Sequence, residues 1–253
     1  SLAQQIVAEI TPRETNLGEL TEFTYTIIPD MRPGIDRGFS AVEISTPVRA
    51  ASIGQITYRS ADGSVDLSQD FSDVDDFTAL PATRGQLTLD LVEEKRFLVR
   101  FPKITASSIE EGEMATLTVT FTSPVLRAAT AFSGRVLPDV PEGEEGGGLT
   151  QELSGGNAAD LREAGSGLLQ ANPANLVVQV PIEGSLLINV DTSSPLISPN
   201  GDTINDTATL NYDITSLIGG AKVRALIYDL SGRLIKEVYA GNDPSGRYSR
   251  PWD

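Results

Sequence analysis

Residues 21–28 read Thr21-Glu22-Phe23-Thr24-Tyr25-Thr26-Ile27-Ile28, and apolar side chains occupy every second position from Phe23 to Ile27. Successive side chains of a β-strand point to opposite faces, so this alternation predicts a half-buried strand with Phe23, Tyr25 and Ile27 on its inner face. Pro29 ends the run. A strand of this kind needs a second apolar surface to cover it, which favours a β-sandwich.

Similar short runs occupy the first 190 residues and are separated by turns that contain Gly or Pro. Asp62-Gly63 lies between two of them and predicts a hairpin. Residues 93–96, which are all charged, are expected to join a pair of alternating strands at 86–91 and 97–101. Other strands are expected at residues 5–10, 39–45, 115–122, 128–137, 175–180 and 185–190. This spacing is typical of an all-β sandwich and not of βαβ units.

Composition limits the classes of function. The 253 residues, 40% of them hydrophobic, are enough for two domains with a sizeable core. The chain has 19 basic and 35 acidic residues and a net charge of −16, which repels nucleic acid and anionic lipid. It contains no apolar run long enough to cross a membrane as a helix. We therefore expect neither nucleic-acid binding nor membrane insertion.

The chain contains no Cys and no His. Disulfides, thiolate sites, a Ser-His-Asp triad and His-ligated zinc or iron are therefore excluded. Glycoside hydrolysis requires two carboxylates at a defined separation, and no spacing among the 35 acidic residues singles out such a pair. We expect no catalytic residues and a protein that is not an enzyme.

A segment rich in Gly and Glu, at about residues 139–174, interrupts the β pattern. It offers too little apolar surface to offset the entropy of ordering it, so we expect a mobile insertion. Because strand patterning resumes after the insertion, the sequence predicts a first sandwich domain over residues 1–190. A second domain is then expected over residues 191–253.

The second domain contains an acidic loop, Ser198-Pro199-Asn200-Gly201-Asp202-Thr203-Ile204-Asn205-Asp206. Hard cations take carboxylate, amide and carbonyl oxygens, so the loop is a candidate calcium site. Its candidate ligands are Asn200, Asp202, Asn205 and Asp206. The alternative is a turn in which these side chains hydrogen-bond to nearby backbone. The acidic residues 62–76 present the same choice between a second calcium loop and a solvated loop or edge strand.

The acidic loop, the stretch Ile227-Tyr228-Asp229-Leu230-Ser231-Gly232-Arg233 and the pair Trp252-Asp253 together resemble the FlgD-like family. This is the immunoglobulin-like domain of flagellar hook-capping proteins, with related C-terminal domains in many secreted bacterial surface proteins. The resemblance covers about residues 191–253. It implies an immunoglobulin-like sandwich on a secreted or cell-surface protein, and some related domains direct export through type IX secretion. Thr203 stands where the family commonly has a second Gly.

Two functions from different classes follow. The first is a non-catalytic structural or assembly protein, acting as spacer, adhesion module or filament subunit, with other subunits or cell-surface components as partners. The second is a calcium-assisted polysaccharide-binding module of a larger secreted protein.

The second domain also has fewer strands than its resemblance implies. An immunoglobulin-like sandwich needs about seven strands over about 100 residues, whereas residues 191–253 contain four or five strand-like runs. An incomplete sandwich leaves an unpaired sheet edge and uncovered apolar surface. Either the native chain continues, or a neighbouring molecule adds a strand by β-augmentation.

Overall fold

The computed structural model describes residues 1–106, 114–139, 149–156, 171–181, 185–194, 207–217 and 219–252. Within these ranges the regular structure consists of β-strands and two short 3₁₀ turns, η1 (Phe77–Ala79) and η3 (Pro173–Leu176). The prediction of an all-β sandwich protein is confirmed. No helix in the described ranges has the length and apolarity to cross a membrane.

The chain forms two compact units. Unit 1 comprises Ser1–Thr15, Leu20–Pro124 and Ala129–Gln179. Unit 2 comprises Val180–Asp253 with two short segments, Asn16–Glu19 and Val125–Ala128.

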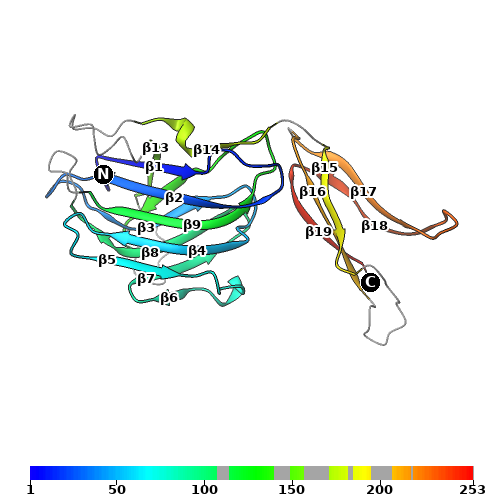
Figure 1. Ribbon diagram of the computed structural model, residues 1–253, viewed down its shortest axis with the longest axis horizontal. Coiled ribbons are helices and arrows are strands. Elements are labelled where there is room, and N and C mark those ends of the chain that lie inside the picture. The colour runs from blue at the N-terminus through cyan, green and yellow to red at the C-terminus, as the bar shows by residue number, and fades with distance from the viewer. Residues whose placement is uncertain are drawn as a thin grey trace. The chain divides into compact units, whose positions relative to one another are not determined.

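Unit 1 is a sandwich of two six-stranded sheets, and Figure 1 shows its two layers. In order across the first sheet, the strands are β13 (Ser154–Gly155), β1 (Gln5–Thr11), β2 (Leu20–Asp30), β9 (Thr116–Pro124), β4 (Ser52–Arg59) and β5 (Asp66–Asp70). In the second they are β12 (Gln151–Glu152), β11 (Gly134–Leu137), β3 (Phe39–Ser45), β8 (Arg96–Ile104), β7 (Leu87–Val92) and β6 (Ala82–Arg84). A small pair, β10 (Ala129–Ala131) with β14 (Val177–Gln179), completes the unit.

The two large sheets of unit 1 enclose an aromatic core. Phe121 lies 5.8 Å from Phe23 on the neighbouring strand and 5.0 Å from Phe97 of the facing sheet, measured between ring centroids. Phe132 contacts Phe23 at 5.2 Å. Phe23, Tyr25 and Ile27 are all buried, so the alternation of residues 21–28 places its inner face correctly. The tilted ring arrangements add to the stabilisation given by burial itself.

Both hairpins predicted in unit 1 are present, with β4 pairing to β5 and β7 pairing to β8. Regular alternation over residues 86–91 places Leu91 on the inner face with Leu87 and Leu89, and for Leu91 this expectation is wrong. A β-bulge between Leu89 and Leu91 shifts the alternation, so Leu91 is half-buried and Val92 is buried. An extra residue in one strand exchanges the two faces beyond it.

The single strand expected over residues 128–137 is also wrong. It is two strands, β10 and β11, which pair with β14 and β3 in different sheets. Phe132 lies between them and is fully buried. The chain therefore passes from one sheet to another at Phe132, whose side chain fills the core. In the sequence, such a change of sheet looks the same as one continuous alternating strand.

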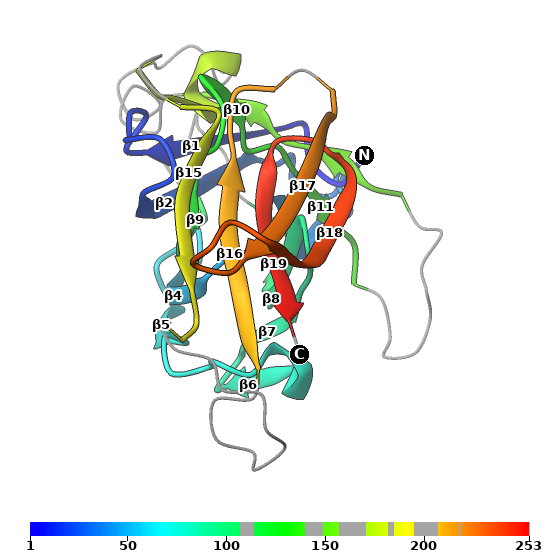
Figure 2. The same cartoon turned by 90° about the vertical axis from the view of Figure 1, so that its right-hand side faces the viewer.

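Unit 2 has fewer strands. One sheet contains β15 (Leu187–Thr192), β16 (Ala208–Ile214) and β19 (Gly246–Trp252), and the other contains β17 (Ala221–Tyr228) and β18 (Leu234–Asp243). Figure 2 shows β17 and β18 in front of β16 and β19. The domain boundary expected at Val190 falls inside β15, and β15 pairs with β16.

Candidate functional site

The predicted calcium ligands Asn200, Asp202, Asn205 and Asp206 lie outside the described residues, as does the greater part of the Gly-rich segment. The calcium site and the mobile insertion therefore stay predictions.

The acidic residues 62–76 are described, and their carboxylates serve local turns. Asp62 accepts hydrogen bonds from the Ser60 hydroxyl at 2.7 Å and from the Ser64 backbone N–H at 2.9 Å. These bonds, that from Ser60 first, lower the pKa of Asp62 to about 2. Asp70 and Asp76 likewise accept bonds from the residues two positions further along. Such contacts are those of Asx turns and caps.

Asp73 is used differently, because its carboxylate pairs with the Arg84 guanidinium at 2.6 Å. Within the described ranges, no group of three or more acidic side chains is arranged to hold a metal ion.

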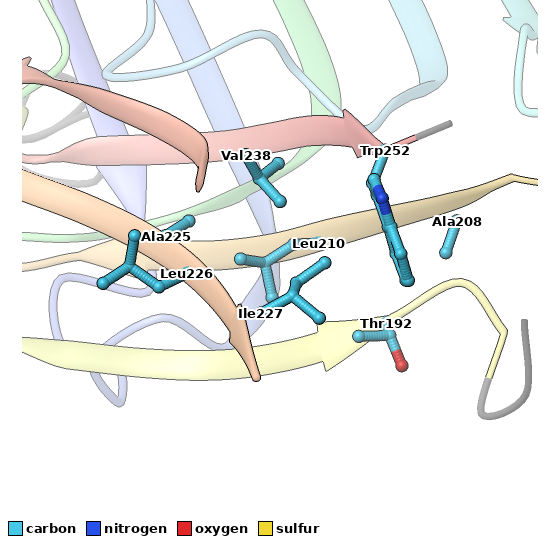
Figure 3. Close-up of a pocket in the computed structure, with 8 residues that line it drawn as sticks. All are labelled: Thr192, Ala208, Leu210, Ala225, Leu226, Ile227, Val238 and Trp252. Atoms are coloured by element: carbon cyan, nitrogen blue, oxygen red, sulfur yellow. The ribbon is translucent and has the colours of Figure 1, made fainter. Parts of the chain in front are cut away.

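The most distinctive site lies between the two sheets of unit 2. It is a pocket of about 310 Å³ to which all five strands of the unit contribute, as Figure 3 shows. The lining residues are mainly apolar: Thr192, Ala208, Leu210, Ala225, Leu226, Ile227, Val238 and Trp252. A sandwich core is normally filled to the density of an organic crystal, so the described residues of unit 2 leave this part of the core loosely packed.

Two features of the strands leave the pocket open. Ala208 and Ala225 contribute only methyl groups where the sheets face each other. In addition, β17 pairs with β18 on one side and with no other described strand on its second side. Trp252, the only Trp of the chain, is half-buried at the pocket wall.

A network of tyrosines and one ion pair fills another part of unit 2. The Arg250 guanidinium donates to Asp243 at 2.8 Å and lies 3.6 Å from the centre of the Tyr239 ring. Tyr239 and Tyr212 both donate their hydroxyl protons to the Asp243 carboxylate. The hydrogen bond to Asp243, together with burial, raises the pKa of Tyr239. Asp243 is buried with a full set of donors, which is how a buried carboxylate is stabilised.

The outer face of β15, β16 and β19 carries a polar hollow of about 500 Å³. At its centre Asp213, which is buried, receives two hydrogen bonds from Arg247 at 2.8 and 2.9 Å. Asn189 donates to the same carboxylate at 2.6 Å. The hydrogen bonds between Arg247 and Asp213 raise the pKa of Arg247. Because the charges of Asp213 and Arg247 satisfy each other, the hollow presents mainly neutral polar groups and the exposed Asp191.

Exposed apolar side chains gather at the turn between β17 and β18. Tyr228 is 54% exposed, Leu234 49%, Ile235 50%, and Leu230 at the turn itself is fully exposed. Large exposed apolar groups that lie together mark interaction surfaces.

A scan against protein-family models and a search of curated proteins each found no match to this chain.

Some pocket residues follow from the sequence and others do not. Alternation in residues 207–214 and 223–227 places Leu210, Ala225 and Ile227 on inner faces, and a lone Trp on an alternating strand is most often a core residue, so these four positions follow from the sequence. Leu226 is missed because it lies between the inward positions Ala225 and Ile227, where alternation assigns it to the outer face. The register between β17 and β18 shifts beside it, with Val238 of β18 as the extra residue. The openness of the pocket depends on how many strands flank it, which no local pattern encodes.

Proposed function

We propose that the protein is a non-catalytic structural or assembly protein of the cell surface or secreted space, and that unit 2 takes up an additional β-strand. The single observation that carries this proposal is the apolar pocket between two sheets that are short of strands. Added strands bind through main-chain hydrogen bonds along a free edge, and pockets for alternate side chains give them specificity. The secreted or surface location rests on the resemblance of residues 191–253.

The polar groups of the described residues support a non-catalytic role. The buried carboxylates Asp36, Asp213 and Asp243 each accept hydrogen bonds from an Arg and from further donors. A general acid or base needs a proton-transfer position that faces substrate, and these groups face their own structural partners.

Peptide addition to the whole chain tests strand uptake. The probe is an eight-residue peptide of alternating Val and Thr, with a Gly/Ser peptide of equal length as control. Strand addition beside β17 should shift the emission of Trp252 to shorter wavelength, because the pocket wall loses water. No difference between the two peptides would contradict the proposal.

The polysaccharide-binding alternative is favoured by one observation, the polar hollow beside Asp191, Asn211 and Ser249. A glycan array with and without calcium distinguishes it, since a structural module should show no selective binding. The calcium part has its own test. Millimolar calcium should raise the melting temperature by linkage, and Asp202→Ala should abolish the rise. An unchanged melting curve in chelator would reject the site.

A further inference from the structure

Strand β5 is an edge of the first sheet of unit 1, and it is acidic. Its exposed positions are Asp66, Ser68 and Asp70, while Leu67 and Gln69 are half-buried. In the described structure it pairs only with β4. Six Asp residues and no Lys or Arg occur between positions 62 and 76. The edge therefore presents a concentrated negative charge.

Part of the β5 backbone is available for pairing. The Phe71 N–H donates to Gly54 on β4, and the carbonyl of Val65 accepts from Ser60. Alternate residues of an antiparallel edge strand direct their N–H and C=O groups to opposite sides. Asp66 and Ser68 therefore direct theirs away from β4. The Asp70 carbonyl already accepts a bond from Arg84, so the free edge is centred on Asp66 and Ser68.

Strand β17 is the complementary edge. Its exposed Lys222 and Arg224 both lie on the face opposite the pocket-facing Ala225. No acidic residue occurs between positions 214 and 228. Arg224 is paired with Glu237 on β18 at 2.5 Å, and both groups are largely solvated. An exposed pair of this kind contributes little by itself and yields readily to a new partner.

We propose that the strand taken up beside β17 is β5 of a second copy of this chain. This inference rests on the proposed function and adds the identity of the occupant. The charges select the pairing: β5 against β5 sets Asp beside Asp, β17 against β17 sets cation beside cation, and only β5 against β17 is attractive. Like charges across a strand pair are destabilising and opposite charges stabilising.

Pairing of β5 with β17 of another copy would join their two sheets into one. One antiparallel register places opposite charges together on one face of this joint sheet and apolar side chains together on the other. With Lys222 opposite Asp70, Arg224 lies opposite Ser68, where Asp66 and Asp70 are its diagonal neighbours and within reach of its long side chain. On the other face Ala225 then lies opposite Leu67. Leu67 lies opposite the buried Tyr58 of β4, so its side chain points to the core side of its own sheet.

This register covers the pocket. The side chain of Leu67 leaves the joint sheet on the same face as Ala225, which lines the pocket. Apolar surface that is open in one copy is thereby covered by the edge strand of the next. The two edges belong to different units, so the contact is heterologous. A pair of copies therefore still has a free β5 edge on one copy and a free β17 edge on the other. Unless the rotation closes a ring, the product is a linear filament.

Charge reversal on the full-length chain tests the pairing. Sedimentation velocity over a concentration series at low salt, with Trp252 emission, measures association and pocket closure together. Lys222→Glu with Arg224→Glu should weaken association by roughly tenfold or more, and so should Asp66→Lys with Asp70→Lys. High salt should also weaken the association of the unaltered protein, because salt screens the attraction between the two edges.

Two further samples make the test specific. An equimolar mixture of the two reversed variants, and a chain that carries all four substitutions, should both recover association, because each again offers opposite charges. Recovery also shows that the variants fold. The matched control is Arg49→Glu with Glu94→Lys, which inverts an exposed ion pair elsewhere on unit 1 and should leave association unchanged.

Two results overturn the inference: a monomer at every concentration, or association that survives both reversals. The Val/Thr peptide then separates the two proposals. If the peptide still shifts Trp252 emission, strand uptake stands and only the second copy is rejected as occupant. If the peptide also fails, the proposed function fails with it.

Discussion

Unit 1 and unit 2 use the same construction with different numbers of strands, and the number decides whether the core closes. Unit 1 faces six strands against six and buries Phe23, Phe97, Phe121 and Phe132 completely or nearly so. In the part of the chain that the structure describes, unit 2 faces three strands against two and leaves a pocket of about 310 Å³ walled by Trp252. A two-stranded sheet is too narrow to cover the apolar face of a three-stranded one.

The difference in strand number explains why unit 2 exposes more apolar surface than unit 1. Both units follow the same alternation of apolar and polar residues, yet in unit 2 the apolar set is not matched by enough sheet to hide it. Seven of the ten large exposed hydrophobic side chains in the described residues belong to β15, β17, β18 or the short segments beside them. Within the described residues, exposed apolar surface is thus concentrated in unit 2.

The largest expected effect is a core truncation in unit 1. Phe121→Ala removes a ring that contacts three other rings and should lower the free energy of unfolding by about 4 kcal/mol. Leu210→Ala, whose side chain borders the open pocket, should cost only about 1 kcal/mol. Denaturant unfolding of both variants measures the contrast. Equal losses would mean that unit 2 is as tightly packed as unit 1.

A smaller effect is expected at an ion pair of unit 1 in which the carboxylate of Asp36 is buried and the Arg32 side chain is partly exposed. The Arg32 guanidinium binds both carboxylate oxygens of Asp36, and the Ser1 hydroxyl donates to the same group at 2.6 Å. The hydrogen bond from Arg32 is the main cause that holds the pKa of Asp36 well below its usual range. Asp36→Asn should therefore cost about 2 kcal/mol at pH 7.

The stabilisation by Asp36 should depend on pH, and the direction follows from its lowered pKa. A lowered carboxyl pKa contributes stability above the unfolded pKa of 3.8, and the contribution is lost as pH falls through that value towards the folded pKa. The difference between the unaltered protein and Asp36→Asn should therefore shrink below about pH 4. Unfolding titrations at a series of pH values measure it. A difference that is constant down to pH 3 would contradict the role of Asp36.

The corresponding polar contact in unit 2 should matter slightly less. Arg250→Met keeps an unbranched apolar side chain but removes the guanidinium that lies over the Tyr239 ring and pairs with Asp243, so a loss of about 1.5 kcal/mol is expected. Tyr212 and Tyr239 continue to donate to Asp243 and limit the loss. Thermal unfolding followed by Trp252 fluorescence reports on this unit, because the only Trp of the chain lies in it. The exposed Arg233→Met serves as control and should be neutral.

The smallest expected effect has the opposite sign. Ala225→Leu adds apolar volume to the pocket and should stabilise unit 2 by about 0.5–1 kcal/mol, as cavity filling commonly does. The same change in the packed core of unit 1, at Ala41, should destabilise the protein because no space is available there. Two melting curves suffice. Destabilisation by Ala225→Leu would show that the pocket is already filled in solution.

Local patterns predicted the strands better than they predicted the assembly of strands. Phe23, Tyr25 and Ile27 are read correctly because one face of β2 is buried along its length. The shift at Leu91 and the change of sheet at Phe132 depend on a bulge and on core packing, which involve neighbours distant in sequence. The ion pair of Asp213 with Arg247 joins residues on two strands and leaves no signature in either.

The candidate site divides in the same way. Alternation predicts that Leu210 and Ile227 point inwards, but it does not show that the space between them is left open. That depends on the absence of a described partner beside β17, which is a property of the whole sheet. The acidic residues 62–76 show the converse. Their composition suits a cation, and the structure uses Asp62 and Asp76 to fix turns.

The order of strands in the first sheet of unit 1 has a consequence for biosynthesis. β2 and β4 both pair with β9, and β1 pairs in parallel with β13, so the interior of this sheet is assembled from segments far apart in the chain. A ribosome delivers β2 and β4 long before β9, so the edges of these strands that pair with β9 lack their partner until it emerges. Such non-local pairing slows folding and prolongs contact with chaperones. The hairpin of β17 and β18, by contrast, pairs as soon as it is made.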